Sequence, residues 1–447
     1  MSNFLWKERK WLLILLYIQY GFNMNKIFLI LSVFVMHPAV HAQQNNPLSL
    51  EECIRKTGNR SPLNRQKEIS RESHELRLRN LTTGWYPAVG LNAQASYNSE
   101  TIDLSGLMEN PPVSIPSLPL DQYKLWADVN QQLYDGGLTR AQKTIEKISH
   151  ESELQLVETD LLAIKQQTNQ VYFSLLLTLK NRDILQVSLE ELRERKNIIR
   201  SGVDNGVLLQ ENLLSMDAEE LKLEQRLLGL DLSRQQLLNT LSVLMDTSLS
   251  ENTVLAIPDE PARDDGPSRR PEYSLFEMQK LKFDASRKLV SAAELPRFFA
   301  FSQLAYGRPG YNMISTDFHT FYTIGVGMKW NFLNYGNHLR QKKILDLQKS
   351  TVDIRRENFD DQVRLQLDAE MASMIKYAEM LKKDSQIVAL RKNISASSFA
   401  KLTNGVITAT DYLSDLNAEL LAQLMYENHG ILRLQSAYNY LLLQGKI

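Results

Sequence analysis

The sequence predicts a mixed, mainly α-helical fold in which long α-helical coiled-coil hairpins join four membrane β-strands, arranged as two internal repeats. Three observations predict it. Residues 131–221 align without gaps to residues 330–420, which lie 199 positions later. Each copy contains a run of more than 60 residues without Gly or Pro, the usual breaks in regular structure. Before each run, apolar and polar residues alternate over segments of strand length.

The matches between the two copies cluster at the ends of the long runs. Gly137 corresponds to Gly336, and Asn205-Gly206-Val207 corresponds to Asn404-Gly405-Val406. At about 1.5 Å per residue, a helix from the first glycine to the turn spans roughly 100 Å. Each run is therefore expected to be one rod-like helix, with a glycine turn that lets the chain reverse into a second helix.

Apolar residues in the first long helix follow the alternating spacing of three and four that forms a coiled-coil seam. They are Val157, Leu161, Ile164, Val171, Leu175, Leu185, Leu189, Leu192 and Ile199. The second copy keeps this spacing less regularly, at Val363, Leu367, Met374, Leu381 and Val388.

The first repeat is expected to cover residues 43–256. It begins with a helix from Leu48 to about Thr83, which Ser49 caps ahead of an acidic first turn. Alternating residues then predict a β-hairpin over 88–134, whose two strands are separated by a proline-rich loop. A helical hairpin over 137–246, with its tip at 203–207, completes the repeat.

A linker over residues 257–271, with four prolines among charged residues, leads into the second repeat at 272–447. This repeat follows the same plan. A helix is followed by a β-hairpin over 298–332 and by a helical hairpin over 336–443, whose tip is at 402–406.

Strands of about ten residues with one apolar face match the hydrocarbon thickness that an outer-membrane strand must cross. Aromatic residues expected near strand ends would form an interfacial belt: Trp85, Tyr86, Tyr97, Tyr123, Trp126, Tyr134, Tyr322 and Trp330. Four strands cannot close a barrel, and lipid does not tolerate an open edge. Several chains must then contribute, and a trimer would supply twelve strands. The alternation alone leaves open a soluble antiparallel sheet beside a coiled coil.

Composition excludes several function classes. A formal net charge of −1 gives no indication of a nucleic-acid partner. The histidines are dispersed, and no phosphate-binding loop, nucleophile motif or metal-ligand spacing occurs, so we expect neither an enzyme nor a cofactor. The single cysteine, Cys53, is expected to be a buried small residue.

Residues 1–42 contain an export signal. A basic residue and a short apolar run follow Met24, and a small-residue cleavage site ends at Ala42. Translation is expected to start at Met24, so that residues 1–23 are a non-native start. The residue after the cleavage site is Gln43 rather than cysteine, which argues against a lipid anchor there.

Short motifs at corresponding places in the two repeats resemble the TolC-like outer membrane efflux protein family, the trimeric outer membrane factors. Leu133-Tyr134-Asp135-Gly136-Gly137 and its echo, Phe332-Leu333-Asn334-Tyr335-Gly336, are similar to the family's strand-to-helix corner. The stretch from Asn404 to Leu413 is similar to the family's hairpin tip. The resemblance covers about residues 48–445, and its most specific part is the duplicated order with fixed spacing.

The resemblance implies a homotrimer with a 12-stranded β-barrel in outer-membrane lipid and an α-helical barrel that extends into the periplasm. It implies a periplasmic adaptor protein and an inner-membrane pump as partners. The family's adaptor-contact positions match Gly206, Val207, Gly405, Val406 and Ile407, and its strand–helix corners match Gly136, Gly137 and Gly336. The first tip has Asn212 where the second has Asp411, which puts in doubt any role that needs an acid in both repeats.

Two further sets of side chains have alternative interpretations. Asp411 and Asp415 lie four residues apart on one helix face, and in a trimer they could form carboxylate rings at a pore constriction, or simply a solvated surface. Met371, Met374 and Met380 could line a path for soft metals, but their spacing favours ordinary helix packing.

These observations predict a passive exit duct of a tripartite efflux system. Two alternatives remain open within similar architectures: an exit duct for type I protein secretion, and a non-porous structural coiled-coil or adhesin trimer. A soluble enzyme is the third class. Conductance in a planar bilayer separates a duct from the non-porous alternatives.

Overall fold

The computed structural model describes residues 47–101, 117–264, 266–312, 315–332 and 335–447. The expected start at Met24, the signal segment 1–42 with its cleavage after Ala42, and most of the proline-rich loop lie outside these residues.

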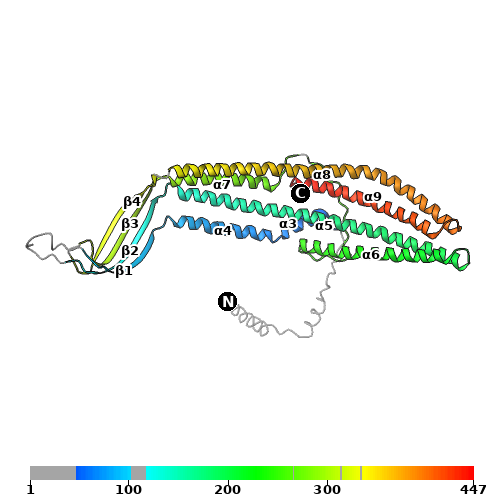
Figure 1. Ribbon diagram of the computed structural model, residues 1–447, viewed down its shortest axis with the longest axis horizontal. Coiled ribbons are helices and arrows are strands. Elements are labelled where there is room, and N and C mark those ends of the chain that lie inside the picture. The colour runs from blue at the N-terminus through cyan, green and yellow to red at the C-terminus, as the bar shows by residue number, and fades with distance from the viewer. Residues whose placement is uncertain (1–46, 102–116, 265, 313–314, 333–334) are drawn as a thin grey trace, which may run out of the picture. The chain divides into compact units, whose positions relative to one another are not determined.

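The described chain consists of long helices and one sheet (Figure 1). The first repeat contains α3 (Leu50–Arg60), α4 (Leu63–Thr83), β1 (Ala88–Tyr97), β2 (Asp121–Tyr134), α5 (Leu138–Asp204) and α6 (Gln210–Met245). The second contains α7 (Pro271–Ala293), β3 (Arg297–Arg308), β4 (His319–Lys329), α8 (Tyr335–Thr403) and α9 (Ala409–Leu443). The predicted fold class, mainly helical with four antiparallel strands, is confirmed.

The expected single helix before the first strand is divided into α3 and α4. Pro62 lacks an N–H group and cannot continue the helical hydrogen-bond ladder, so α3 ends where Ser61 N–H donates to the Thr57 carbonyl. The cap predicted at Ser49 is confirmed, because its hydroxyl accepts a hydrogen bond from Glu52 N–H. Pro271, expected as the last linker residue, is the first residue of α7.

The helices pack side by side in a fixed order. Near the sheet, α4 packs on α5, α5 on α7 and α7 on α8; toward the tips, α6 packs on α5, α5 on α9 and α9 on α8. Figure 1 shows α7 ending partway along α8, where α9 takes its place. Within the described residues, α4 and α6 therefore form one edge of the helical layer, and α8 forms the other.

Two hydrophobic clusters hold this layer together. One lies where α3, α5, α6 and α9 meet, around Tyr172, Phe173 and Leu241, and the other lies near the tips, around Leu192, Leu402 and Tyr412. Tyr172 also donates its hydroxyl to the carbonyls of Leu48 and Ala256. This bond ties the segment before α3 to the start of the linker.

The residues of the predicted coiled-coil seam are mostly buried in the first repeat and mostly only partly buried in the second. Most first-copy members are buried in the clusters or between α5 and its neighbours, including Val157, Leu175 and Leu192. In the second copy only Val363 is buried. The reason is that α8 is an edge helix, with no partner on one of its sides within the chain.

The four strands form one antiparallel sheet in the order β1–β2–β3–β4. The two expected hairpins are joined across the repeats, because β2 pairs with β3 from Tyr123–Arg308 to Tyr134–Phe298. A register shift between Gln132 and Tyr134 places the Tyr134 side chain on the same face as Phe298.

Candidate functional site

One face of the sheet is almost entirely apolar and exposed. The cross-strand pairs Leu91–Ala127, Leu304–Tyr322 and Phe298–Met328 all lie on this face. Val326 is 78% exposed and Leu91 is 76% exposed, although both are large aliphatic side chains. A contiguous apolar patch of this extent on a protein surface indicates contact with lipid or with another protein.

The opposite face carries polar side chains in β1 and β2. Asn92 donates a hydrogen bond to Asp128, and Lys124 donates to Gln303 at 2.9 Å. Trp126 pairs with Asn92 across the strands and lies under the Lys124 ammonium, 4.9 Å from the ring centroid to Nζ. Trp126 therefore lies on the opposite face of the sheet from Tyr97 and Tyr322, and its expected place in one aromatic belt with them is wrong.

Two phenylalanine rings also lie on this polar face. A Cβ atom on Gly325 would come within 2.7 Å of the Phe301 ring, and one on Gly327 within 2.5 Å of the Phe299 ring. Phe301 and Phe299 are the cross-strand partners of these two glycines. The glycines therefore make room for the rings to lie flat against the sheet rather than to project from it.

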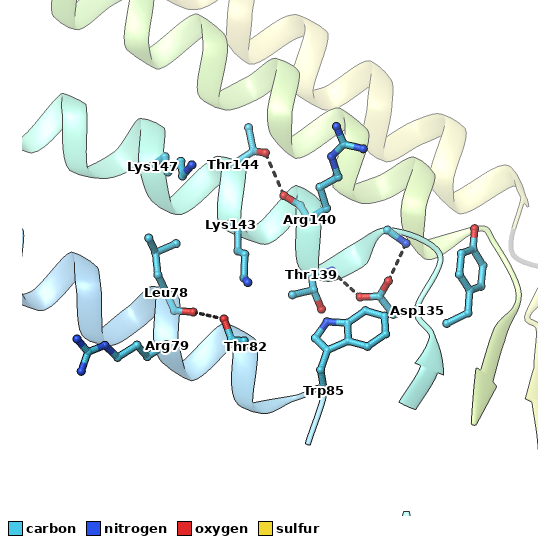
Figure 2. Close-up of a pocket in the computed structure, with 12 residues that line it drawn as sticks. Leu78, Arg79, Thr82, Trp85, Asp135, Thr139, Arg140, Lys143, Thr144 and Lys147 are labelled. Carbon is cyan, nitrogen blue, oxygen red and sulfur yellow. Dashed lines mark hydrogen bonds between the residues drawn. The ribbon is translucent and has the colours of Figure 1, made fainter. Parts of the chain in front are cut away.

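The first strand–helix corner is fixed by Asp135, Gly136 and Gly137 (Figure 2). The buried carboxylate of Asp135 accepts hydrogen bonds from Gly137 N–H at 2.8 Å and Thr139 N–H at 2.7 Å, which caps α5. Burial alone would raise the pKa of Asp135, but the hydrogen bonds from Thr139 and Gly137 outweigh it, so this pKa is lowered. Gly136 and Gly137 have φ angles of 72° and 86°, which L-residues with a side chain rarely adopt.

The second corner is built differently. Gly336 lies inside the first turn of α8, and its φ is outside the left-handed region. Leu333 and Asn334 lie outside the described residues. The indole N–H of Trp330 donates to the Glu294 carbonyl at 3.0 Å, which links the end of the sheet to the end of α7.

Both predicted tips are tight glycine turns between helices, at the end of the helical layer remote from the sheet (Figure 1). Gly206 and Gly405 have φ angles of 70° and 72°. The apolar residue after each glycine is exposed, with Val207 at 67% and Val406 at 69%. Ile407 differs, since its side chain packs against the hydrophobic cluster near the tips.

The two tips are joined by a hydrogen bond that sequence reasoning missed. The side-chain oxygen of Asn212, in the first turn of α6, accepts from Ala409 N–H in the first turn of α9 at 2.9 Å. Asn212 is the residue that replaces the acid found at Asp411 in the second repeat. The uncharged side chain of Asn212 therefore links the two repeats. The sequence around Asn212 gives no indication that Ala409 is its partner.

Asp411 and Asp415 each have a partner within the chain. Asp411 forms a capping box with Thr408, and hydrogen bonds from the Thr408 hydroxyl and N–H lower the pKa of this exposed carboxyl. Asp415 accepts from the Ser398 hydroxyl of α8 at 2.5 Å. The structure thus places the two carboxylates near one tip and gives each a different partner.

A second long-range contact near the tips was also missed from the sequence. Arg195 of α5 donates to the buried Tyr412 hydroxyl of α9 at 2.5 Å, and its guanidinium lies 5.2 Å from the Phe399 ring centroid. Burial raises the pKa of Tyr412. This contact joins the first helical hairpin to the second near the tips.

The remaining candidate side chains are Cys53 and the three methionines. Cys53 is fully buried, and burial raises the pKa of its thiol to about 12, so the thiol is unreactive at neutral pH. Met371 and Met374 contact a cavity beside the linker, whereas Met380 is exposed and does not line it. Among the described residues, no cluster of His, Cys, Asp and Glu could hold a metal ion. None of the described helices combines the length and apolar character needed to cross a membrane.

Comparisons with known proteins agree with this architecture. The model of the outer membrane efflux protein family matches residues 56–246. The outer membrane protein VceC from Vibrio cholerae is 15% identical, with a TM-score of 0.67 over 89% of this chain and 96% of VceC. The CmeC outer membrane channel of Campylobacter jejuni is 14% identical, with a TM-score of 0.66 over 90% of this chain and 86% of CmeC.

The open-state MtrE outer membrane channel of Neisseria gonorrhoeae is likewise similar. It is 14% identical, with a TM-score of 0.65 over 89% of this chain and 88% of MtrE. A search of curated proteins found no sequence match. At these identities the likeness to solved structures shows the fold.

Proposed function

We propose that this chain belongs to the outer membrane efflux protein family, whose model matches residues 56–246, and that three copies of it form the outer membrane channel of a tripartite efflux system. The channel is a passive exit duct. It docks on a periplasmic adaptor and an inner-membrane pump, and the pump supplies the energy for export.

The two-faced sheet is the observation that carries this proposal. Its apolar face suits lipid, and its polar face suits a water-filled lumen lined by Asn92, Lys124 and Asp128. The edge strands β1 and β4 have no further partner among the described strands. Because lipid cannot hydrogen-bond to an open edge, β4 of one copy pairs with β1 of the next. Three copies in a closed ring supply twelve strands.

The helical layer supports the same ring. The edge helix α6 exposes leucines at heptad spacing, Leu214, Leu221 and Leu228, and each is more than half exposed. The opposite edge helix α8 exposes its own apolar side chains, among them Ile387 and Ile394, which are also seven residues apart. Packing α6 of one copy against α8 of the next would bury both rows and form an α-helical barrel.

The tips are the proposed adaptor contacts. Val207 and Val406 present exposed apolar side chains at the ends of the two hairpins, next to Gly206 and Gly405, where the backbone is accessible. Ile407 supports the turn from inside, so its contribution to docking is indirect. Docking therefore depends on Val207 and Val406 more than on Ile407.

Single-channel recording in planar bilayers tests the proposed function. Purified full-length protein is expected to give stepwise increases in current, because each inserted trimer adds one pore. Protein that inserts into the bilayer without conducting would instead support the non-porous structural trimer. Copurification with an adaptor encoded beside a drug pump, rather than with a protein-secretion complex, separates the two kinds of duct.

A further inference from the structure

A cavity of about 770 Å³ lies between α4 and α5, directly beside the first strand–helix corner. This α4–α5 pocket is lined by Arg79, Trp85, Tyr134, Arg140, Lys143 and Lys147, among others. Figure 2 shows Lys143 extending from α5 toward α4, and Trp85 lying against the first turn of α5. Its volume is within the range typical of small-ligand sites, roughly 300–1,000 Å³.

The pocket carries uncompensated positive charge. Its lining contains four cationic side chains and one carboxylate, a formal net charge of +3. Arg140, Lys143 and Lys147 form no ion pair with any described residue, and Arg79 lies 3.9 Å from Glu75. The single carboxylate, Asp135, is occupied by the N–H groups of Gly137 and Thr139. The nearby Glu146 is paired with His74 and Arg77 on the other side.

Tyr134, which lines the pocket, lies on the apolar face of the sheet. The register shift in β2 places Tyr134 on that face, with its ring 6.2 Å from the Phe298 ring. Gln131, on the same face, donates to the Trp85 carbonyl at 2.8 Å. Trp85 and Tyr134 therefore separate the apolar sheet face from the cations, which is the arrangement of a protein surface at a membrane–water interface.

The second repeat lacks this charge at the corresponding positions. With the offset of 199, Arg140 corresponds to Leu339 and Lys147 to Asp346. Lys342, the counterpart of Lys143, is neutralised by Glu294 at 2.8 Å. At these three positions the free cations are therefore specific to the first repeat and are not a consequence of the duplicated architecture.

We propose that the α4–α5 pocket binds the phosphate headgroup of an anionic glycerophospholipid in the periplasmic leaflet of the outer membrane. The inference rests on the proposed function, which places the apolar sheet face in that membrane. Lys143 and Lys147, one helical turn apart, contact the phosphate, while Trp85 and Tyr134 lie against the glycerol and the start of the acyl chains. One lipid bound beside the first corner of each chain would fix the depth of the duct in the bilayer.

The test is native mass spectrometry of the full-length protein in mild detergent, titrated with dioleoyl-phosphatidylglycerol or with zwitterionic dioleoyl-phosphatidylcholine. The wild type is expected to retain phosphatidylglycerol preferentially. Lys143→Gln with Lys147→Gln is expected to weaken this binding about 25-fold, since each cation near a membrane surface contributes about a fivefold effect and the two effects multiply. The control is Lys343→Gln with Lys392→Gln, which removes two exposed, unpaired cations from α8 and is expected to leave binding unchanged.

Three results would overturn the proposal: no preference for phosphatidylglycerol, an equal loss in the control, or displacement of the lipid by millimolar inorganic phosphate. The last would make the pocket a site for free anions. The same proteins are recorded in planar bilayers. If they conduct but show no lipid preference, only the headgroup site fails. If they insert without conducting, the proposed duct fails, whatever the lipid result.

Discussion

Replacing Gly136 or Gly137 of the first corner by alanine distinguishes two costs to the stability of the fold. One is the strain of a left-handed backbone, and the other is the steric overlap of the new Cβ atom. Gly136 and Gly137 both have left-handed backbone, so Ala at either position costs about 1–2 kcal/mol. At Gly136 the new Cβ would also lie 2.8 Å from the Ala292 carbonyl oxygen and 2.9 Å from Leu295 Cβ. At Gly137 it would meet nothing within 4 Å.

The overlap at Gly136 must be relieved by moving the end of α7, which is already packed at the buried Ala292. Overpacking of this kind costs a further ~1–3 kcal/mol. We therefore expect Gly136→Ala to destabilise the protein by about 2–5 kcal/mol and Gly137→Ala by about 1–2 kcal/mol. Effects on the unfolded chain are the same for both variants and cancel in the comparison.

Urea unfolding of the full-length protein in one detergent, followed by far-UV circular dichroism, measures both variants against the wild type. The Gly136→Ala midpoint is expected to be the lowest of the three. Equal midpoints for the two variants, or the reverse order, would refute the packing of this corner against α7.

Three further predictions concern the proposed α6–α8 interface between copies, the first strand–helix corner and the tip of the second helical hairpin. Leu221→Asp should weaken assembly by at least tenfold in dissociation constant, because it places a charge in the interface proposed between α6 of one copy and α8 of the next, while Ser233→Asp, exposed on another face of α6, should not; sedimentation in detergent measures both, and equal behaviour contradicts this interface. The pKa of Asp135 is lower in the folded protein than in the unfolded chain, where it is near 4. The carboxylate therefore stabilises the fold above pH 4, and this stabilisation is lost as the pH falls through the pKa of the folded protein. Asp135→Asn should therefore lower the urea midpoint at pH 7 and flatten its dependence on pH below about 4; an unchanged profile contradicts the capping role. Asp411→Asn with Asp415→Asn should weaken block of single-channel current by divalent cations, and unchanged block removes the carboxylate constriction.

The long helices and the alternating strands were predictable because they depend on local patterns. The absence of Gly and Pro between Gly137 and Gly202 leaves nothing to interrupt a helix, and α5 extends from Leu138 to Asp204. The alternation around Leu91 likewise assigns a two-faced strand to the position of β1. Pro62 was present in the sequence as a break, but the helical pattern on both sides of it hid the division.

Contacts between distant segments were not predictable, because no local pattern encodes them. The Arg195–Tyr412 and Asn212–Ala409 contacts join residues that are 217 and 197 positions apart, and each depends on how the two hairpins pack. The residue type of Trp126 suggested a place in the aromatic belt, but its strand register places it on the polar face of the sheet.

Duplication alone does not make the two repeats equivalent. Gly137 has left-handed backbone at the first corner, whereas its counterpart Gly336 is helical. The unpaired Lys143 corresponds to Lys342, which is paired with Glu294. The long helices of the two repeats are nevertheless similar in length, with 67 residues in α5 and 69 in α8. The two repeats therefore share the distance from sheet to tip but differ in the charged residues at their corners.

In the proposed duct, one chain supplies only a third of the ring. The mass of the purified full-length protein in mild detergent, measured by native mass spectrometry, tests it. A complex of three chains is expected, because it closes the edges of the sheet and buries the exposed rows on α6 and α8. A stable single chain with these surfaces still exposed would contradict it.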